Sequence, residues 1–138
     1  SAARGEAGAG GDIPRGEGTV LLVEDEVHLA RLMEKILVGL GYRVTTCTDS
    51  MQAWSIFRAN PQDFDLVFTD MTMPGINGAE LSGKILLLSP EKPIILCTGF
   101  NELITEEQAK KQGIRAYLRK PVPIEQLART LHTILHKT

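Results

Sequence analysis

Acidic, hydroxyl and amino side chains stand at the ends of short apolar segments along this chain. The acidic run Glu24–Glu26 follows the first such segment, and Asp70 follows the third. Thr98 ends the fourth, and Lys120 follows the fifth. Several carboxylates in a small space repel one another and stay ionised only when a cation joins them. Oxygen ligands with room for water suit Mg²⁺ best, so these residues predict a magnesium site if the segment ends meet.

A phosphoryl group is the anion that such a site is suited to receive, because the cation neutralises its oxygens. Asp70 would be the nucleophile and would become an acyl phosphate. Lys120 can pair with Asp70 before the reaction and with a phosphoryl oxygen after it, and the Thr98 hydroxyl can donate to another oxygen. Taken singly, Asp25 could merely cap a helix and Lys120 could be an ordinary surface lysine. The agreement of the whole set favours the chemical interpretation.

Short apolar runs alternate five times with longer amphipathic runs, which predicts alternating strands and helices. The expected strands are Thr19–Glu24, Arg43–Cys47, Asp65–Thr69, Pro93–Thr98 and Ala116–Arg119. The expected helices are Glu26–Leu40, Ser50–Asn60, Gly78–Leu88, Asn101–Gln112 and Ile124–His136. Three of the strands are apolar at consecutive positions, as expected when helices cover both faces of a sheet. We therefore expect an α/β fold, a doubly wound (βα)₅ sandwich with a parallel sheet and a site at the carboxyl ends of its strands.

Composition excludes several classes of function. The 138 residues carry 15 basic and 17 acidic side chains, a formal net charge of −2, and no basic stripe that would predict nucleic-acid binding. No apolar run is long enough to span a bilayer, so we expect no membrane contact by this domain. Cys47 and Cys97 are interpreted as reduced core thiols. Residues 1–18 are Gly-rich and are expected to form a flexible leader, native or a cloning scar, before a domain at 19–138.

With these features in place, the sequence resembles the receiver domains of bacterial response regulators and hybrid histidine kinases. The segments that carry the resemblance are LLVEDE at 21–26, FTDMTMPGINGAEL at 68–81, ILCTGF at 95–100 and AYLRKP at 116–121. The likeness covers residues 19–138. It implies a flavodoxin-like sheet with the strand order 2-1-3-4-5, and a role in a two-component phosphorelay.

The resemblance also implies the metal ligands. Glu24 and Asp25 would bind Mg²⁺, which Mn²⁺ can replace, together with Asp70 and the backbone carbonyl of Thr72. Many members of the family have aspartate where this chain has Glu24, and the longer side chain could ligate through water.

The same resemblance implies a phosphorylation switch. Asp70 corresponds to the phosphoacceptor, Lys120 to the invariant lysine, and Thr98 and Tyr117 to the switch hydroxyl and the switch aromatic. A phosphoryl group would attract Thr98, let Tyr117 swing inward and reshape the face made by the fourth helix, fifth strand and fifth helix. A static, half-exposed Tyr117 is the alternative. The family's Lys-Pro bond is usually cis, so we expect a cis bond before Pro121.

The expected first helix has an unusually broad apolar face, with Leu29 and Leu32 on the margin nearest the acidic residues. We expect this margin and Pro121 to bind a histidine kinase or a histidine phosphotransfer protein. Deeper burial of the two leucines is the equal alternative. A homodimer through the face of the fourth helix, fifth strand and fifth helix is also expected.

The residues of this chain argue against the rival functions. A flavodoxin-like cofactor binder needs glycines and hydroxyls where this chain has acidic residues. An aspartyl phosphohydrolase typically has a second aspartate where this chain has Thr72. An interaction module that is not phosphorylated usually lacks the acceptor or the lysine, whereas this chain has both Asp70 and Lys120. His132 and His136 have zinc-type spacing but no evident third ligand. We expect a cytoplasmic domain that is no enzyme beyond its own phosphorylation. It would be the terminal receiver of a hybrid sensor histidine kinase, tethered to the membrane if that kinase is, or else a stand-alone regulator.

Overall fold

The computed structural model of the chain describes residues 13–99 and 104–136. The strands are β1 (Thr19–Val23), β2 (Arg43–Cys47), β3 (Leu66–Asp70), β4 (Ile94–Thr98) and β5 (Ala116–Arg119). The helices are α1 (Val27–Gly39), α2 (Ser50–Ala59), the 3₁₀ helix η1 (Pro61–Asp63), α3 (Gly78–Leu88), α4 (Glu106–Gln112) and α5 (Ile124–Leu135). Among the helices within these ranges, none is long and apolar enough to cross a membrane.

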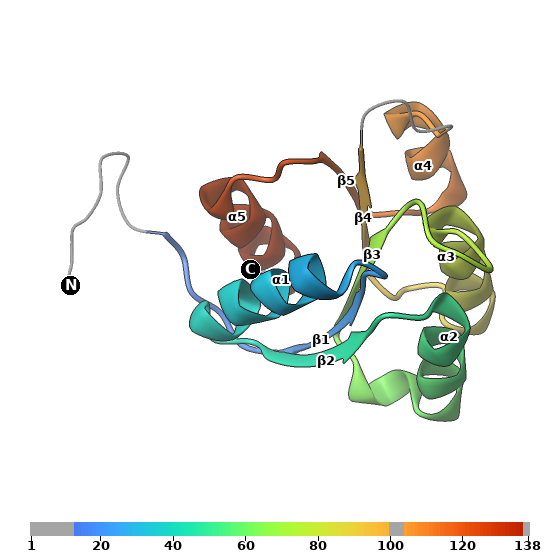
Figure 1. Cartoon of the computed structure of the whole chain (residues 1–138), viewed down its shortest axis with the longest axis horizontal. Coiled ribbons are helices and arrows are strands. Elements are labelled where there is room, and N and C mark those ends of the chain that lie inside the picture. The colour runs from blue at the N-terminus through green and yellow to red at the C-terminus, as the bar shows by residue number, and fades with distance from the viewer. Residues whose placement is uncertain (1–12, 100–103, 137–138) are drawn as a thin grey trace.

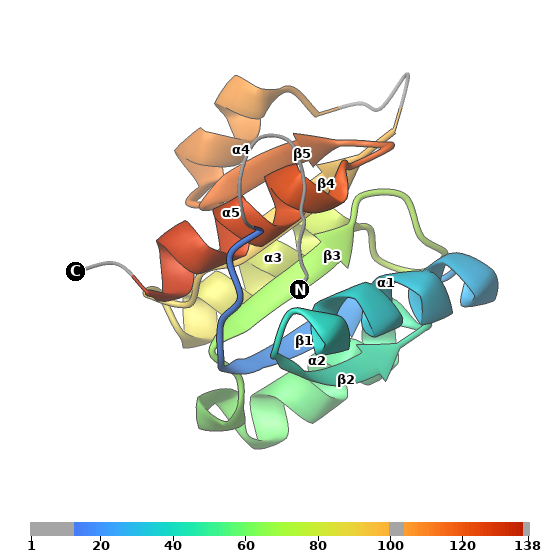
Figure 2. The ribbon, with the colours of Figure 1, turned by 90° about the vertical axis from the view of Figure 1, so that its left-hand side faces the viewer.

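The strands form one parallel sheet in the order β2-β1-β3-β4-β5. Helices α1 and α5 cover one face of this sheet, and α2, α3 and α4 cover the other (Figures 1 and 2). The change of winding direction between β1 and β3 places a crevice at the carboxyl ends of these two neighbouring strands. The predicted doubly wound fold and strand order are confirmed.

Two apolar cores lie on opposite faces of the sheet, and the strands supply both of them. Along β1, Val20 and Leu22 pack with α1 and α5, whereas Leu21 and Val23 pack with α2 and α3. Because successive side chains of a strand point to opposite faces, a strand covered on both sides must be apolar at every position. Both cysteines, Cys47 and Cys97, are free and buried in these cores, as predicted.

The largest difference from the predicted boundaries is at α4. The helix begins at Glu106 and not at Asn101, although residues 101–103 lie outside the described residues. Thr105 accepts a hydrogen bond from the Gln108 N–H, and the Gln108 side chain accepts one from the Thr105 N–H. This reciprocal capping box satisfies two amide groups at the helix start and fixes the start there. The other predicted boundaries agree with the structure to within one residue.

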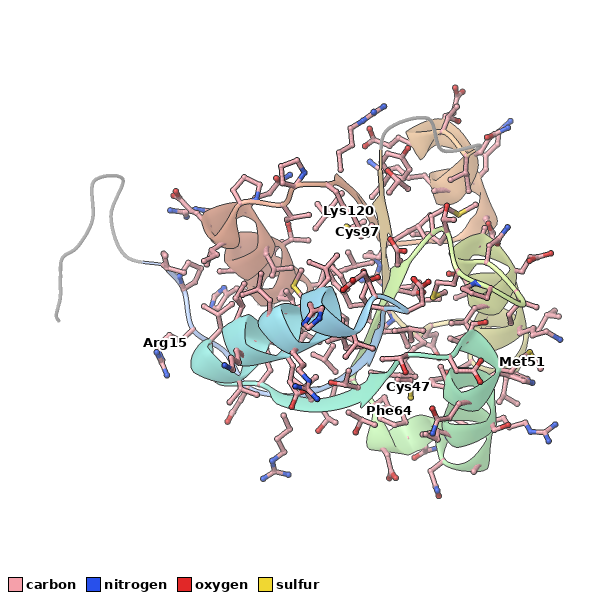
Figure 3. The ribbon with its side chains drawn as sticks, viewed as in Figure 1. Arg15, Cys47, Met51, Phe64, Cys97 and Lys120 are labelled. Atoms are coloured by element: carbon pink, nitrogen blue, oxygen red, sulfur yellow. The ribbon has the colours of Figure 1, made fainter. Side chains whose placement is uncertain are left out.

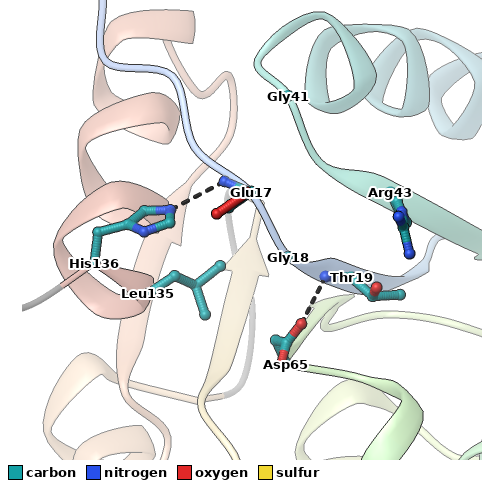
Figure 4. A pocket seen from close by; sticks show the side chains of 8 residues that line it. All are labelled: Glu17, Gly18, Thr19, Gly41, Arg43, Asp65, Leu135 and His136. Carbon is teal, nitrogen blue, oxygen red and sulfur yellow. Dashed lines mark hydrogen bonds between the residues drawn. The ribbon is translucent and has the colours of Figure 1, made fainter.

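The segment before β1 contains no helix or strand in residues 13–18, but its backbone is bonded to the domain. The Gly16 N–H donates to the Leu40 carbonyl at 2.9 Å, and the Glu17 N–H donates to His136 Nε2 at 3.1 Å. The second bond crosses a cleft of about 600 Å³ at the amino ends of β1, β2 and β3 (Figure 4). The first part of the expected leader, residues 1–12, lies outside the described residues.

Two leucines on α3 provide a matched test of the packing. Leu81 is 0% exposed in the core under α2 and α3, whereas Leu87 is 88% exposed. We expect Leu81→Ala to lower the free energy of unfolding by about 2–5 kcal/mol, through lost burial and the cavity left behind. Leu87→Ala should change it by less than about 0.5 kcal/mol. Urea unfolding followed by circular dichroism measures both, and similar losses in the two variants would contradict this packing.

Candidate functional site

Three carboxylates meet where β1 and β3 end. The register pairs Val23 with Thr69, so Glu24 follows β1 beside Asp70, the last residue of β3. One carboxylate oxygen from each of Glu24, Asp25 and Asp70 lies within 4.8 Å of the others. Glu24 is 6% exposed and Asp70 is 4% exposed, whereas Asp25 is half-buried. Among the described residues, this is the one group of three or more potential metal ligands, so His132 and His136 form no such group.

Lys120 supplies the positive charge of the site. Its Nζ lies 2.8 Å from Asp70 Oδ1 and 3.3 Å from Glu24 Oε1. The backbone positions it, because the Lys120 N–H donates to the Thr98 carbonyl at 2.8 Å. The bond between Lys120 and Pro121 is cis, as predicted. Burial acts to lower the pKa of Lys120, but the hydrogen bond and attraction of Asp70, with those of Glu24, outweigh it and raise the pKa above 10.5.

Both carboxylate oxygens of Glu24 have partners in the protein. Oε1 faces Lys120, and Oε2 accepts a hydrogen bond from the Glu26 N–H at 3.1 Å. Its own N–H donates to the Cys47 carbonyl at 3.0 Å, at the end of β2. Burial raises the pKa of Glu24 above 4.5, and the Asp70 charge adds to the rise against the opposing pull of the Glu26 N–H and Lys120. With all groups ionised, three carboxylates and one ammonium leave two negative charges, which suits a divalent cation.

Two residues that support the β3–α3 connection were missed by the sequence analysis. Gly78 begins α3, and a Cβ there would overlap the carbonyl of Asp70. Its N–H donates to the Met71 carbonyl at 2.7 Å, so glycine lets the helix start directly against the end of β3. Ser50 is fully buried and donates to the Pro74 carbonyl at 3.1 Å. A glycine at the first residue of a helix, where it is not favoured, was the available sign of such a close approach.

The two predicted switch residues lie on β4 and β5, the two strands that follow β3 in the sheet. Thr98, the last residue of β4, is fully buried, and its hydroxyl faces the Leu118 carbonyl at 3.5 Å, the outer limit of a hydrogen bond. Tyr117 on β5 is half-buried, and its hydroxyl donates to the Ile104 carbonyl at 3.0 Å. Thr98 therefore ends its strand as predicted, but its hydroxyl is bonded across to β5.

An apolar groove of about 440 Å³ borders the acidic cluster. All three predicted partner-binding residues, Leu29, Leu32 and Pro121, line it, and Glu24 and Lys120 lie at its polar end. Leu32 is 55% exposed and Leu29 is half-buried, so deeper burial, the alternative for these leucines, is wrong for Leu32. The buried Cys97 also lines the groove, beside Lys120 (Figure 3).

The fold and this site together define a doubly wound α/β domain with an acidic cluster at the carboxyl ends of its strands. The sequence model of the response regulator receiver domain matches residues 20–132, and the chain belongs to that family. This membership decides against the flavodoxin-like cofactor binder and the phosphohydrolase.

Known relatives agree with the family. The chain is 34% identical to the two-component response regulator ARR14 of Arabidopsis thaliana over 78% of this chain and 28% of the relative. It is 29% identical to the response regulator RppA of Synechocystis sp. over 86% of this chain and 51% of the relative. A crystal structure of a response regulator receiver domain protein from Clostridium thermocellum superposes with a TM-score of 0.82 and 29% identity, over 86% of this chain and 94% of that one. The chain spans between about a quarter and a half of the two relatives.

Removing the Lys120 charge should destabilise the metal-free protein. Lys120→Met leaves buried Glu24 and Asp70 without their cation, and we expect a loss of about 1–3 kcal/mol in the free energy of unfolding at about pH 8. The pKa of Glu24 is raised in the folded state, so ionising Glu24 costs stability as the pH rises above 4.5. At about pH 5 less of this charge has formed, so the loss of stability caused by Lys120→Met should be smaller than at about pH 8.

Urea unfolding with a chelator present, at both pH values, measures this effect. Lys110→Met removes a lysine whose ion pair with Glu106 is exposed and should cost less than about 1 kcal/mol. A loss in Lys120→Met that did not depend on pH would contradict the electrostatic explanation.

Proposed function

We propose that this domain accepts a phosphoryl group on Asp70 from a phosphohistidine of a histidine kinase or a histidine phosphotransfer protein. The position of Asp70 carries the proposal. Its carboxylate is nearly buried at the end of β3, is paired with Lys120 at 2.8 Å, and lies within 4.8 Å of oxygens of Glu24 and Asp25. Membership of the receiver family supports the same function.

The acidic residues fit a Mg²⁺ ion, and Mn²⁺ would be able to replace it. Receiver domains bind Mg²⁺ in an acidic pocket, and here Glu24, Asp25 and Asp70 would hold it with the Thr72 carbonyl. When bound, the ion neutralises oxygens of the phosphoryl group. Both oxygens of Glu24 already have protein partners, Lys120 and the Glu26 N–H, which supports ligation of this residue through water.

The transfer needs no other nucleophile from the protein. An oxygen of the Asp70 carboxylate forms a bond to phosphorus while the phosphorus–nitrogen bond of the phosphohistidine breaks. The electron pair of that bond stays with the imidazole nitrogen, which leaves. Lys120 loses part of its pairing with Asp70 and gains a phosphoryl oxygen as partner. The domain would thus catalyse only its own phosphorylation.

A switch at β4 and β5 would report the phosphoryl group. The Thr98 hydroxyl would leave its long bond with the Leu118 carbonyl for a phosphoryl oxygen, and Tyr117 would give up the Ile104 carbonyl as it turns inward. Inverting a 1:99 population requires about 5.5 kcal/mol of differential binding. A few charge-assisted hydrogen bonds can supply much of that. The α4-β5-α5 face would change as a result, and dimerisation through it stays a prediction.

The groove beside α1 would receive the phosphodonor. Its apolar residues Leu29, Leu32 and Pro121 line the same groove as Lys120, so a helix seated there would bring its histidine toward Asp70. The hybrid-kinase context and the cytoplasmic location stay predictions. The names of the relatives reported above are those of response regulators, which favours a regulator as the parent protein.

Phosphorylation should require Asp70 and a divalent ion. Incubation with acetyl phosphate and Mg²⁺ should add the mass of one phosphoryl group to the protein, measured by intact-mass spectrometry. The gain should disappear in Asp70→Asn and fall strongly in Asp25→Asn or with a chelator. Asp63→Asn, which changes an exposed aspartate in η1, should leave it unchanged. An equal gain in Asp70→Asn would refute the proposal.

Partner transfer should depend on the groove, whereas transfer from a small donor should not. Leu32→Glu places a charge in an apolar contact and should slow phosphotransfer from a cognate histidine kinase by about tenfold or more. Val38→Glu is the matched control, because Val38 is also on α1 and is 52% exposed but does not line the groove. Rates with acetyl phosphate should be equal in all three proteins. Equal slowing with both donors would contradict docking at this groove.

A further inference from the structure

The β3–α3 loop carries Thr72 between points that are fixed to the rest of the domain. The Met71 N–H donates to the Cys97 carbonyl at 2.9 Å, and the Met71 carbonyl accepts from Gly78 at 2.7 Å. The side chains of Met71 and Met73 are buried in the core under α2 and α3, whereas Thr72 is exposed between them. The loop therefore alternates inward and outward, as an extended chain does.

Ser50 fixes the loop from the other side. It is the first residue of α2, is fully buried, and its hydroxyl donates to the Pro74 carbonyl at 3.1 Å across 24 positions of the sequence. The next loop residue, Gly75, has a φ of +81°, and a Cβ there would lie 3.4 Å from the Ser50 hydroxyl oxygen. The serine thus lies directly against the point where the loop turns toward α3.

The Ser50 hydroxyl is not needed to cap its own helix. Asp49 does this, because its Oδ1 accepts from the Met51 N–H at 3.0 Å. Ser82, the other fully buried serine within the described residues, bonds inside its own helix, to the Gly78 carbonyl four residues before it. Ser50 is therefore used for a contact between two segments, whereas Ser82 serves its own helix.

The β2–α2 connection touches both loops that carry the acidic site. Cys47, at the end of β2, accepts the hydrogen bond from the Glu24 N–H at 3.0 Å, and Ser50, three residues later, holds the Pro74 carbonyl at 3.1 Å. Figure 3 shows Cys47 and Met51 at the two ends of this connection. One short segment is therefore hydrogen-bonded to both the loop after β1 and the loop after β3.

We propose that Ser50 is a positioning residue for the metal site. By holding the Pro74 carbonyl it restricts the backbone on which the Thr72 carbonyl, a ligand in the function proposed above, must be presented. Mg²⁺ tolerates little distortion of its octahedral shell, so a loosened ligand weakens binding. Groups that orient metal ligands from behind typically contribute 10–100-fold to metal affinity. The inference rests on the proposed function, because it assumes that the site binds a divalent ion.

Measuring metal binding directly distinguishes a positioning role of Ser50 from a general structural role. Free Mn²⁺ is titrated by electron paramagnetic resonance against the full chain, Ser50→Ala, Ser50→Cys and the control Ser82→Ala. We expect Ser50→Ala to raise the dissociation constant for Mn²⁺ by about tenfold. Ser82→Ala should leave it unchanged, although it too removes a hydrogen bond from a fully buried serine. Ser50→Cys should lie between, because a thiol is a weak donor of similar size.

Each outcome decides one question. Unchanged Mn²⁺ affinity in folded Ser50→Ala, or an equal loss in Ser50→Ala and Ser82→Ala, would overturn the positioning role while leaving the proposed function intact. If Ser50→Ala fails to fold, the affinity of Ser50→Cys decides in the same way. Absence of Mn²⁺ binding by the unaltered protein would overturn the proposed function, and the positioning role with it.

Discussion

Crowding of like charge in a mostly buried cluster is the constraint on which the rest of the molecule depends. Glu24 and Asp70 are almost fully buried, and Lys120 is the cation within 3.3 Å of both. Removing charges from water costs several kcal/mol for each ion unless partners compensate. One ammonium group compensates only part of three carboxylates. The site therefore retains a surplus of negative charge that a divalent ion can neutralise.

The parallel sheet makes this crowding possible without local sequence contacts. Glu24, Asp70 and Lys120 are separated by 46 and 50 positions, yet all three lie at the carboxyl ends of their strands. Helices bury both faces of the sheet. The carboxyl ends of neighbouring strands therefore lie together at one edge, and their backbones are held in fixed positions. Gly78 shows how close the elements come, because even a methyl group there would collide with Asp70.

The sequence was sufficient for the fold and for the acidic site because both follow from the order of the elements. Asp25, Asp70 and Lys120 could be predicted from their places after apolar runs. The start of α4 was missed although the sequence carried a sign of it, because Thr105 and Gln108 have the spacing of a capping box whereas Asn101 has no such partner three residues later. Ser50 bonds to a loop 24 positions away, which no local pattern reveals. The orientation of the Thr98 hydroxyl depends on how closely β5 lies beside β4, which is a property of tertiary packing.

The bond between the Glu17 N–H and His136 also determines how this unit can be combined with others. It brings the two ends of the described domain together at the amino edge of the sheet, and β3 separates that edge from Asp70 by about 16 Å. Units whose ends emerge side by side can be joined to a neighbour, or inserted within one, with little disturbance. Here Asp70 lies at the opposite edge of the sheet, so a neighbour attached at either end would be joined away from the acidic cluster.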